Sequence, residues 1–341
     1  EDGMGATARF ASPHGVAISQ DGVIAVAEAE NHTIRLLEWV PGSEGLGPES
    51  FTVSLAAGVP GEGGMKDGPA EEALFQSPHA VAWTAQGDLL VADIGNARIR
   101  KVSSGVVETV AGSGEVGRRD GEGAEASFHY PMDMALAGDG TLWIADAGAH
   151  SVRSMQANGT VSTKELTSGI DTPHGIALGP DGTVYVAYWD YFDGHMLRRS
   201  YDGGQTMTAP VRMATLMDVW QVQFAPQIPG DFRVPNLSSI AVDPVDGTLY
   251  CVYFDTTEVV GGNSNVDLYL TRSDDGGGTW TTPMVINEDP DPPGDQFFPW
   301  LEVSADGRLH LLYFDSSLVV QNDTASTAWL DAFYAWSDDR G

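Results

Sequence analysis

The chain has 341 residues, of which 42% are hydrophobic and 19% charged, and its 48 acidic and 17 basic residues give a formal net charge of −31. Such a chain can bury a substantial core, and its negative field disfavours nucleic acid and anionic membrane surfaces as partners. The single cysteine, Cys251, excludes an intrachain disulfide and a cysteine zinc cluster, and no stretch approaches the roughly 18 apolar residues of a spanning helix.

A repeat runs through the first part of the chain. Its copies begin with the pairs Asp2-Gly3, Asp67-Gly68 and Asp120-Gly121, and each continues through a phenylalanine to a proline 11 residues after the aspartate. These phenylalanines and prolines are Phe10 and Pro13, Phe75 and Pro78, and Phe128 and Pro131. A fourth, shorter copy reads Pro173-His174-Gly175-Ile176-Ala177. Internal repeats of this kind indicate an architecture of similar units.

Each copy continues into short runs of alternating apolar residues. The second run ends in an acidic residue, and the third ends in an arginine: Glu28 and Arg35, Asp93 and Arg100, Asp146 and Arg153. Apolar alternation with Asp-Gly turns predicts antiparallel hairpins, and the acidic residues are expected to bond turns. The whole pattern resembles the NHL-repeat β-propeller.

The second half of the chain has a different pattern. Ser273-Asp274-Asp275-Gly276-Gly277-Gly278-Thr279-Trp280 resembles the Asp box (BNR repeat) of sialidase-like propellers, and residues 200–207 form a degenerate copy. A third copy starts at Ser337. In that family the Ser and Asp side chains satisfy a hairpin turn, so we expect these motifs to be architectural.

Counting the innermost strands gives six, near residues 14, 79, 132, 174, 239 and 301. We therefore predict an all-β fold, a six-bladed β-propeller of four-stranded antiparallel blades. It forms one domain over residues 1–341, NHL-like to about residue 205 and Asp-box-like from about residue 206. The last blade lacks its outer strand, which the segment around Ala6–Phe10 or a continuation of the chain would supply.

The residue after each repeat proline is expected to face the central channel. In the first four copies these residues are His14, His79, Met132 and His174. Three imidazoles and a thioether predict a divalent metal site, for which zinc is favoured over copper or calcium. Alternatively, the Pro-His-Gly segments simply pack, and each histidine bonds a neighbouring carbonyl.

The histidine arrangement resembles the zinc site of the peptidyl-hydroxyglycine lyase, an NHL propeller, and the Pro-His-Gly-Ile strand of streptogramin lyases. This resemblance implies a metal-assisted hydrolase or lyase acting on a small substrate in an axial pocket. Asp133, next to the ligands, and Tyr188 and Asp190, in an aromatic loop, are the candidate catalytic acid and base groups.

Two other functions remain open. A non-catalytic recognition propeller would bind a protein, peptide or glycan across one face, with no metal. A sialidase-like glycosidase is suggested by Phe232-Arg233-Val234-Pro235, which resembles the substrate-gripping motif of that family but follows the degenerate Asp box instead of preceding the first one.

The expected partner is a small molecule, peptide or glycan, with no nucleic acid or membrane, and the chain is expected to be monomeric. Lysine is represented only by Lys66, Lys101 and Lys164, and such a lysine-poor acidic surface favours a secreted or periplasmic location. The chain opens Glu1-Asp2-Gly3 without a signal peptide, which leaves this expectation open.

Overall fold

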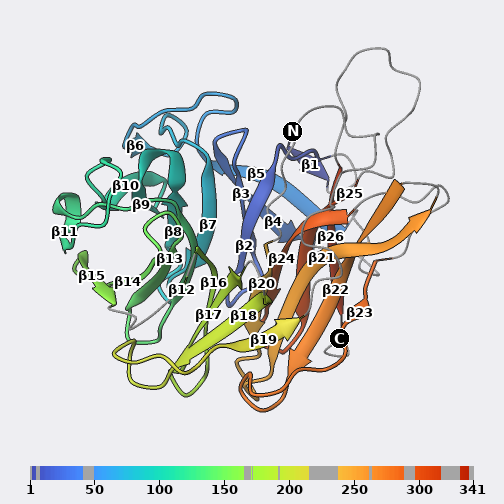
Figure 1. Ribbon diagram of the computed structural model, residues 1–341. Helices are drawn as coiled ribbons and strands as arrows, with labels where there is room; N and C mark the ends of the chain where they lie inside the picture. The colour runs from blue at the N-terminus through green and yellow to red at the C-terminus, as the bar shows by residue number, and fades with distance from the viewer. Residues whose placement is uncertain are drawn as a thin grey trace. The chain divides into compact units, whose positions relative to one another are not determined.

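The computed structural model describes residues 2–4, 8–40, 50–164, 170, 172–190, 193–214, 237–260, 263–287, 296–315 and 331–337. These residues form six antiparallel sheets, each built from one continuous stretch of sequence (Figure 1). The chain divides into two compact units, Glu1–Val186 with Arg199–Thr208 and Ala187–Arg198 with Ala209–Gly341. Of the described residues, none forms a helix with the length and apolar character that a membrane span requires.

The first three sheets have five strands each. From the inner to the outer edge, the first contains β2 (Pro13–Ile18), β3 (Ile24–Glu28), β4 (Thr33–Trp39), β5 (Phe51–Ala57) and β1 (Gly3–Met4). The second contains β7 (Pro78–Trp83), β8 (Leu89–Asp93), β9 (Arg98–Ser103), β10 (Val106–Ala111) and β6 (Gly68–Pro69). The third contains β12 (Pro131–Leu136), β13 (Leu142–Asp146), β14 (Ser151–Met155), β15 (Thr160–Lys164) and β11 (Gly121–Glu122). The 3₁₀ turns η2 (Ile94–Asn96) and η3 (Gly123–Glu125) accompany them.

The remaining sheets are smaller. The fourth contains β16 (Pro173–Leu178), β17 (Val184–Asp190), β18 (Gly194–Ser200) and β19 (Val211–Ala214). The fifth contains β20 (Ser239–Val242), β21 (Leu249–Val260), β22 (Asn263–Ser273) and β23 (Met284–Val285). The sixth contains β24 (Gln296–Val303), β25 (Leu309–Asp315) and β26 (Asp331–Ser337).

The structure confirms an all-β propeller of antiparallel sheets and corrects the prediction of six four-stranded blades. Five sheets have four or more strands, whereas the sixth has three within the described residues. The extra strand of the first three sheets is the Asp-Gly segment that opens each repeat, which pairs with the outer edge of its own sheet. The N-terminal β1 does so with β5, through Gly3 opposite Val53 and Met4 opposite Thr52. The N-terminal strand therefore completes the first sheet.

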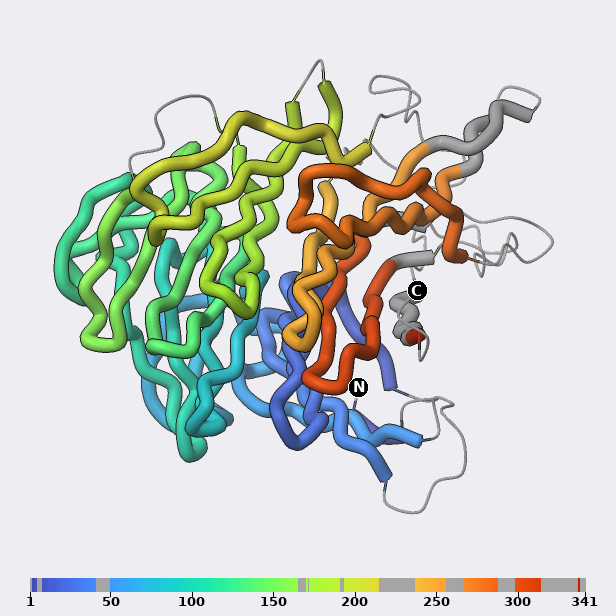
Figure 2. The backbone as a smooth tube through the Cα atoms, turned by 90° about the horizontal axis from the view of Figure 1, so that it is seen from below, coloured from blue at the N-terminus to red at the C-terminus, as the bar shows by residue number. Residues whose placement is uncertain are grey.

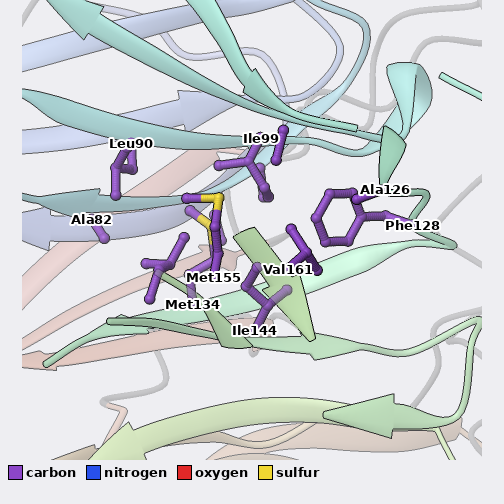
Figure 3. Packing of buried hydrophobic residues seen from close by; sticks show 13 residues of the cluster. Ala82, Leu90, Ile99, Ala126, Phe128, Met134, Ile144, Met155 and Val161 are labelled. Atoms are coloured by element: carbon purple, nitrogen blue, oxygen red, sulfur yellow. The ribbon is translucent and has the colours of Figure 1, made fainter. Parts of the chain in front are cut away.

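The inner strands of the first unit lie side by side in chain order. β2 packs against β7, β7 against β12, and β12 against β16 (Figure 1), and the colours of Figure 2 follow the same order through this unit. Apolar faces fill the space between neighbouring sheets. Figure 3 shows Leu90 and Ile99 of the second sheet beside Ile144, Met155 and Val161 of the third, all buried. Burial of these faces fixes the register of each strand.

The two serine- and aspartate-containing turns of the later sheets have the same hydrogen bonding. After β22, Ser273 Oγ donates to Asp275 Oδ1, which also accepts the N–H of Thr279, both at 2.8 Å. After β18, Ser200 Oγ donates to Asp202 Oδ1 at 2.8 Å. Hydrogen bonds from Thr206 and Ser200 lower the pKa of Asp202 to about 2. The Ser and Asp side chains therefore make hydrogen bonds within their own turns. The third copy, which starts at Ser337, lies outside the described residues from residue 338 onward.

Candidate functional site

The four inner strands of the first unit begin in a strained conformation. The residue before each starting proline has a positive φ: Ser12 (51°), Ser77 (51°), Tyr130 (61°) and Thr172 (47°). Proline disfavours the right-handed helical region for the residue before it, and the left-handed region is costly for any residue with a Cβ. All four strands therefore share one unusual entry.

This entry is followed by an irregularity in strand pairing. In the first three sheets the register shifts immediately after the proline, between Pro13 and Val16, Pro78 and Ala80, and Pro131 and Asp133. His14, His79 and Met132 lie within these shifts. Such a β-bulge changes the direction of a side chain relative to the regular alternation of the strand. Polar residues such as His14 and His79 can therefore occur at the start of strands whose other residues are mostly apolar.

His14 and His79 form a close pair across β2 and β7. Their ring centroids are 4.2 Å apart, and the planes are tilted by 48°. His14 Nδ1 lies 2.9 Å from the carbonyl oxygen of Ser12, and His79 Nδ1 lies 3.2 Å from that of Met132. Burial lowers the pKa of His14. Burial, together with the repulsion that His79 would meet from a protonated His14, lowers the pKa of His79 well below its ordinary value. Both shifts favour the neutral form of the ring.

His174 repeats this arrangement on β16. Its Nδ1 lies 3.4 Å from the carbonyl oxygen of Thr172, and burial lowers its pKa to about 4. Met132 separates it from His79 along the row of inner strands. Among the described residues no three His, Cys, Asp or Glu side chains are grouped closely enough to hold a metal ion. The structure thus brings His14 and His79 together and leaves His174 further along the row.

Asp133 joins β12 to β16. Its Oδ1 accepts the N–H of Met134 and its Oδ2 accepts the N–H of Ile176, both at 2.8 Å. Burial raises its pKa to about 7, although these two hydrogen bonds act in the opposite direction. The carboxyl group therefore changes charge near neutral pH while it holds two neighbouring sheets together.

The other two candidate catalytic residues belong to the second unit. Tyr188, on β17, is 3% exposed. Asp190, at the end of that strand, is half-buried, and its Oδ1 accepts the N–H of Asp193 at 3.0 Å. Asp190 thus bonds a turn in the structure. The arginine motif at residues 232–235 lies outside the described residues.

The first three NHL-like repeats each contain a buried ion-pair network that was not predicted from the sequence. Arg100 is fully buried between Asp93 and Asp67, at 2.8 Å and 2.6 Å, with its guanidinium 5.1 Å from the centroid of the Phe75 ring. Arg35 and Arg153 occupy the same place in the first and third repeats, with Glu28 and Asp2, and with Asp146 and Asp120. The equal spacing of these residues in the three copies was the signal that could have revealed the networks.

His32 and His150 were also missed. Each follows the second strand of its sheet, in the turn that leads to the third strand, at φ 60° and 48°. They hydrogen-bond the backbone of the next sheet, Ser77 and Thr172 respectively. Their shared position in the repeat was visible in the sequence, but only the structure shows what the imidazoles contact.

Comparison with known proteins agrees with this architecture. Residues 10–35 match the model of the NHL repeat. The chain is 30% identical over 200 residues to human NHL repeat-containing protein 2, covering 51% of this chain and 26% of that protein. It is 29% identical over 176 residues to the Arabidopsis thaliana protein SUPPRESSOR OF QUENCHING 1, chloroplastic, covering 49% of this chain and 16% of that protein. The chain thus spans about a quarter or less of the length of these relatives.

Solved structures resemble the chain over nearly its full length. A gluconolactonase from Xanthomonas campestris has a TM-score of 0.55 at 16% identity, covering 89% of this chain and 83% of that one. A luciferin-regenerating enzyme has a TM-score of 0.54 at 13% identity, covering 98% and 94%. A virginiamycin B lyase from Staphylococcus aureus has a TM-score of 0.52 at 11% identity, covering 98% and 87%. The chain is therefore a β-propeller with NHL repeat sequence in its first part.

Proposed function

We propose that this propeller is a metal-assisted hydrolase or lyase that acts on a small substrate at the starts of its inner strands. The observation that carries the proposal is the state of the three imidazoles. Burial lowers the pKa of His14, His79 and His174, which favours the neutral form of each ring, and each ring places Nδ1 against a backbone carbonyl. An Nδ1–H that donates to a carbonyl leaves the lone pair on Nε2, which is the usual arrangement of a histidine metal ligand.

The donor chemistry fits a borderline cation such as zinc better than calcium, because calcium prefers oxygen ligands. His14 and His79 would hold the ion as a pair, and His174 and Met132 are the nearest further donors along the row. A bound cation would lower the pKa of a coordinated water or polarise a carbonyl or phosphoryl oxygen. The enzymes among the structural neighbours, a gluconolactonase and a lyase, support this class of chemistry on this fold.

Asp133 is the proposed acid or base of the site. A carboxyl with a pKa of about 7 can accept or donate a proton near neutrality. Its attachment to the N–H groups of Met134 and Ile176 fixes its orientation during such a transfer. Tyr188 and Asp190 remain proposals for the same role from the second unit.

The finer features of the fold belong to this proposal as well. We propose that the turns after β18 and β22 are Asp boxes of the sialidase-like kind, which their hydrogen bonds support. The chain would act as a monomer on a small molecule, peptide or glycan, in a secreted or periplasmic setting, without nucleic acid or membrane.

A recognition propeller without catalysis is the second candidate. It is favoured by the observation that the described residues contain no cluster of three metal-binding side chains. In that case the imidazoles would serve to pack and to bond the backbone, as their Nδ1 contacts already do.

The enzyme proposal is tested by measuring the hydrolytic ring opening of D-glucono-1,5-lactone through the proton that the acid product releases. Three samples would be assayed on a panel of small lactones and esters. They are the metal-free protein, the same protein reloaded with zinc, and a zinc-treated His79→Ala variant. A zinc-dependent rate that the variant lacks is expected. A rate no different from that of buffer with zinc across the panel would favour recognition.

A further inference from the structure

His32 and His150, which are not among the proposed ligands, hydrogen-bond the backbone just before two of the proposed ligands, His79 and His174. His32, between β3 and β4, accepts at Nδ1 a hydrogen bond from the N–H of Ser77 at 3.1 Å. His150, between β13 and β14, accepts at Nδ1 a hydrogen bond from the N–H of Thr172 at 3.2 Å. Ser77 lies two residues before His79, and Thr172 lies two residues before His174. Each contact therefore reaches from one sheet to the entry of the next inner strand.

The amides that receive this support belong to the strained entries. Ser77 and Thr172 have φ values of 51° and 47°, a conformation that persists only where the surroundings impose it. The hydrogen bond to the preceding sheet is one such constraint. The His32 ring is itself confined, because a Cβ on Gly63 would lie 2.7 Å from His32 Nε2.

The turn histidines are present only in the sheets that precede an inner strand with a candidate histidine ligand. His32 precedes His79, and His150 precedes His174. In the second sheet the equivalent turn carries Ala97, at φ 50°, which has no side-chain acceptor. The inner strand that follows Ala97 begins with Tyr130-Pro131-Met132, and among the four copies this is the one in which the residue after the proline is not histidine. The turn residue is thus histidine where the residue after the proline of the next inner strand is histidine, and alanine where that residue is Met132. A purely structural role of the turn residue would not explain this agreement.

We propose that His32 and His150 are positioning residues, which fix the backbone entry of β7 and β16 and thereby the orientation of the His79 and His174 rings. The Nδ1 of each ring accepts a hydrogen bond from an amide N–H, so this contact requires the tautomer with the ring N–H on Nε2. The inference rests on the proposed function in that His79 and His174 are taken as ligand-binding groups. Groups that hydrogen-bond a metal-binding histidine directly change metal affinity about 10- to 100-fold when removed. His32 and His150 act one step further out, through the backbone of Ser77 and Thr172, so we expect an effect at the lower end of this range.

The test compares His32→Ala, His32→Asn and the control Ala97→Gly in the whole 341-residue chain with ¹⁵N-labelled amides and imidazoles. Alanine is tolerated in this conformation, because Ala97 adopts it. Asparagine favours the left-handed region and supplies a carbonyl acceptor. In metal-free protein we expect His32→Ala to accelerate hydrogen exchange at Ser77 and to shift the ring nitrogens of His79, while His32→Asn restores both. Ala97→Gly should leave both unchanged.

Zinc titration against a chromophoric chelator then gives the functional readout. We expect His32→Ala to weaken zinc binding about 10-fold and His32→Asn to recover most of the loss. The proposal is overturned if the Ser77 amide and the His79 nitrogens of His32→Ala match those of the wild type. It is also overturned if Ala97→Gly changes the exchange rate of the Ser77 amide and the chemical shifts of the His79 nitrogens as much as His32→Ala does. If wild-type protein binds no zinc, the proposed function fails, while the metal-free signals still decide the positioning role.

Discussion

At the scale of single residues, Arg100 shows why the repeat carries its particular residue types. Its guanidinium bonds Asp93, Asp67 and the carbonyl oxygens of Leu74 and Lys66. One buried side chain thus ties two strands and the opening segment of its repeat together, and all its bonds are made within its own sheet and the loop leading to it. The aspartate and arginine that recur in the sequence are therefore parts of one network.

Replacing Arg100 with methionine keeps much of the volume but leaves Asp93 buried without its cation. We expect a loss of about 3–5 kcal/mol in the free energy of unfolding, measured by urea denaturation. Arg119→Met is the control, because the Arg119 side chain is 57% exposed and pairs with Glu115; it should cost less than about 1 kcal/mol. Equal losses in the two variants would show that the buried network does not stabilise the sheet.

Asp133 predicts a pH dependence of stability. Its pKa rises from 3.8 to about 7 on folding, so its protonated form stabilises the fold below about pH 4, and this contribution is lost as the pH rises through 7. Asp133→Asn cannot titrate, and its amide group can accept only one of the two N–H bonds. The wild type should therefore be the more stable at pH 4, and its advantage should shrink by pH 8 in urea denaturation. An advantage independent of pH would contradict the raised pKa.

At the scale of elements, the close contact of neighbouring inner strands decides which residues fit. A Cβ on Gly15 of β2 would lie 2.5 Å from the carbonyl oxygen of His79 on β7. The backbone there must therefore move to admit any side chain. The next inner strand has Ala80 at the equivalent position, and the third has Asp133, which uses the place to bond its neighbour.

Gly15→Ala should destabilise the protein by about 1–3 kcal/mol, since overpacking against backbone forces a shift. Gly138→Ala is the matched control, because a Cβ there meets nothing within 4 Å and its φ is not positive. The control should be neutral or stabilise by up to about 1 kcal/mol. Thermal unfolding of both variants gives the comparison, and equal melting temperatures would refute the close approach.

At the scale of the whole molecule, periodicity predicted the antiparallel sheets because alternation and Asp-Gly turns act locally. It did not predict the fifth strand of the first three sheets, since two-residue strands such as β1 have no periodicity. The residues at the inner strand starts were located from the repeat, but the pairing of His14 with His79 depends on packing between sheets. Likewise, nothing in the spacing shows that His174 stands apart from that pair.

The central claim is that the imidazoles at the inner strand starts bind a metal. The most direct test is elemental analysis of untagged protein after zinc loading and removal of free metal, for the wild type and for His14→Ala/His79→Ala. We predict about one zinc per chain in the wild type and a marked loss in the variant, with circular dichroism showing that both are folded. Equal zinc contents, or a wild type that retains no zinc, would contradict the claim.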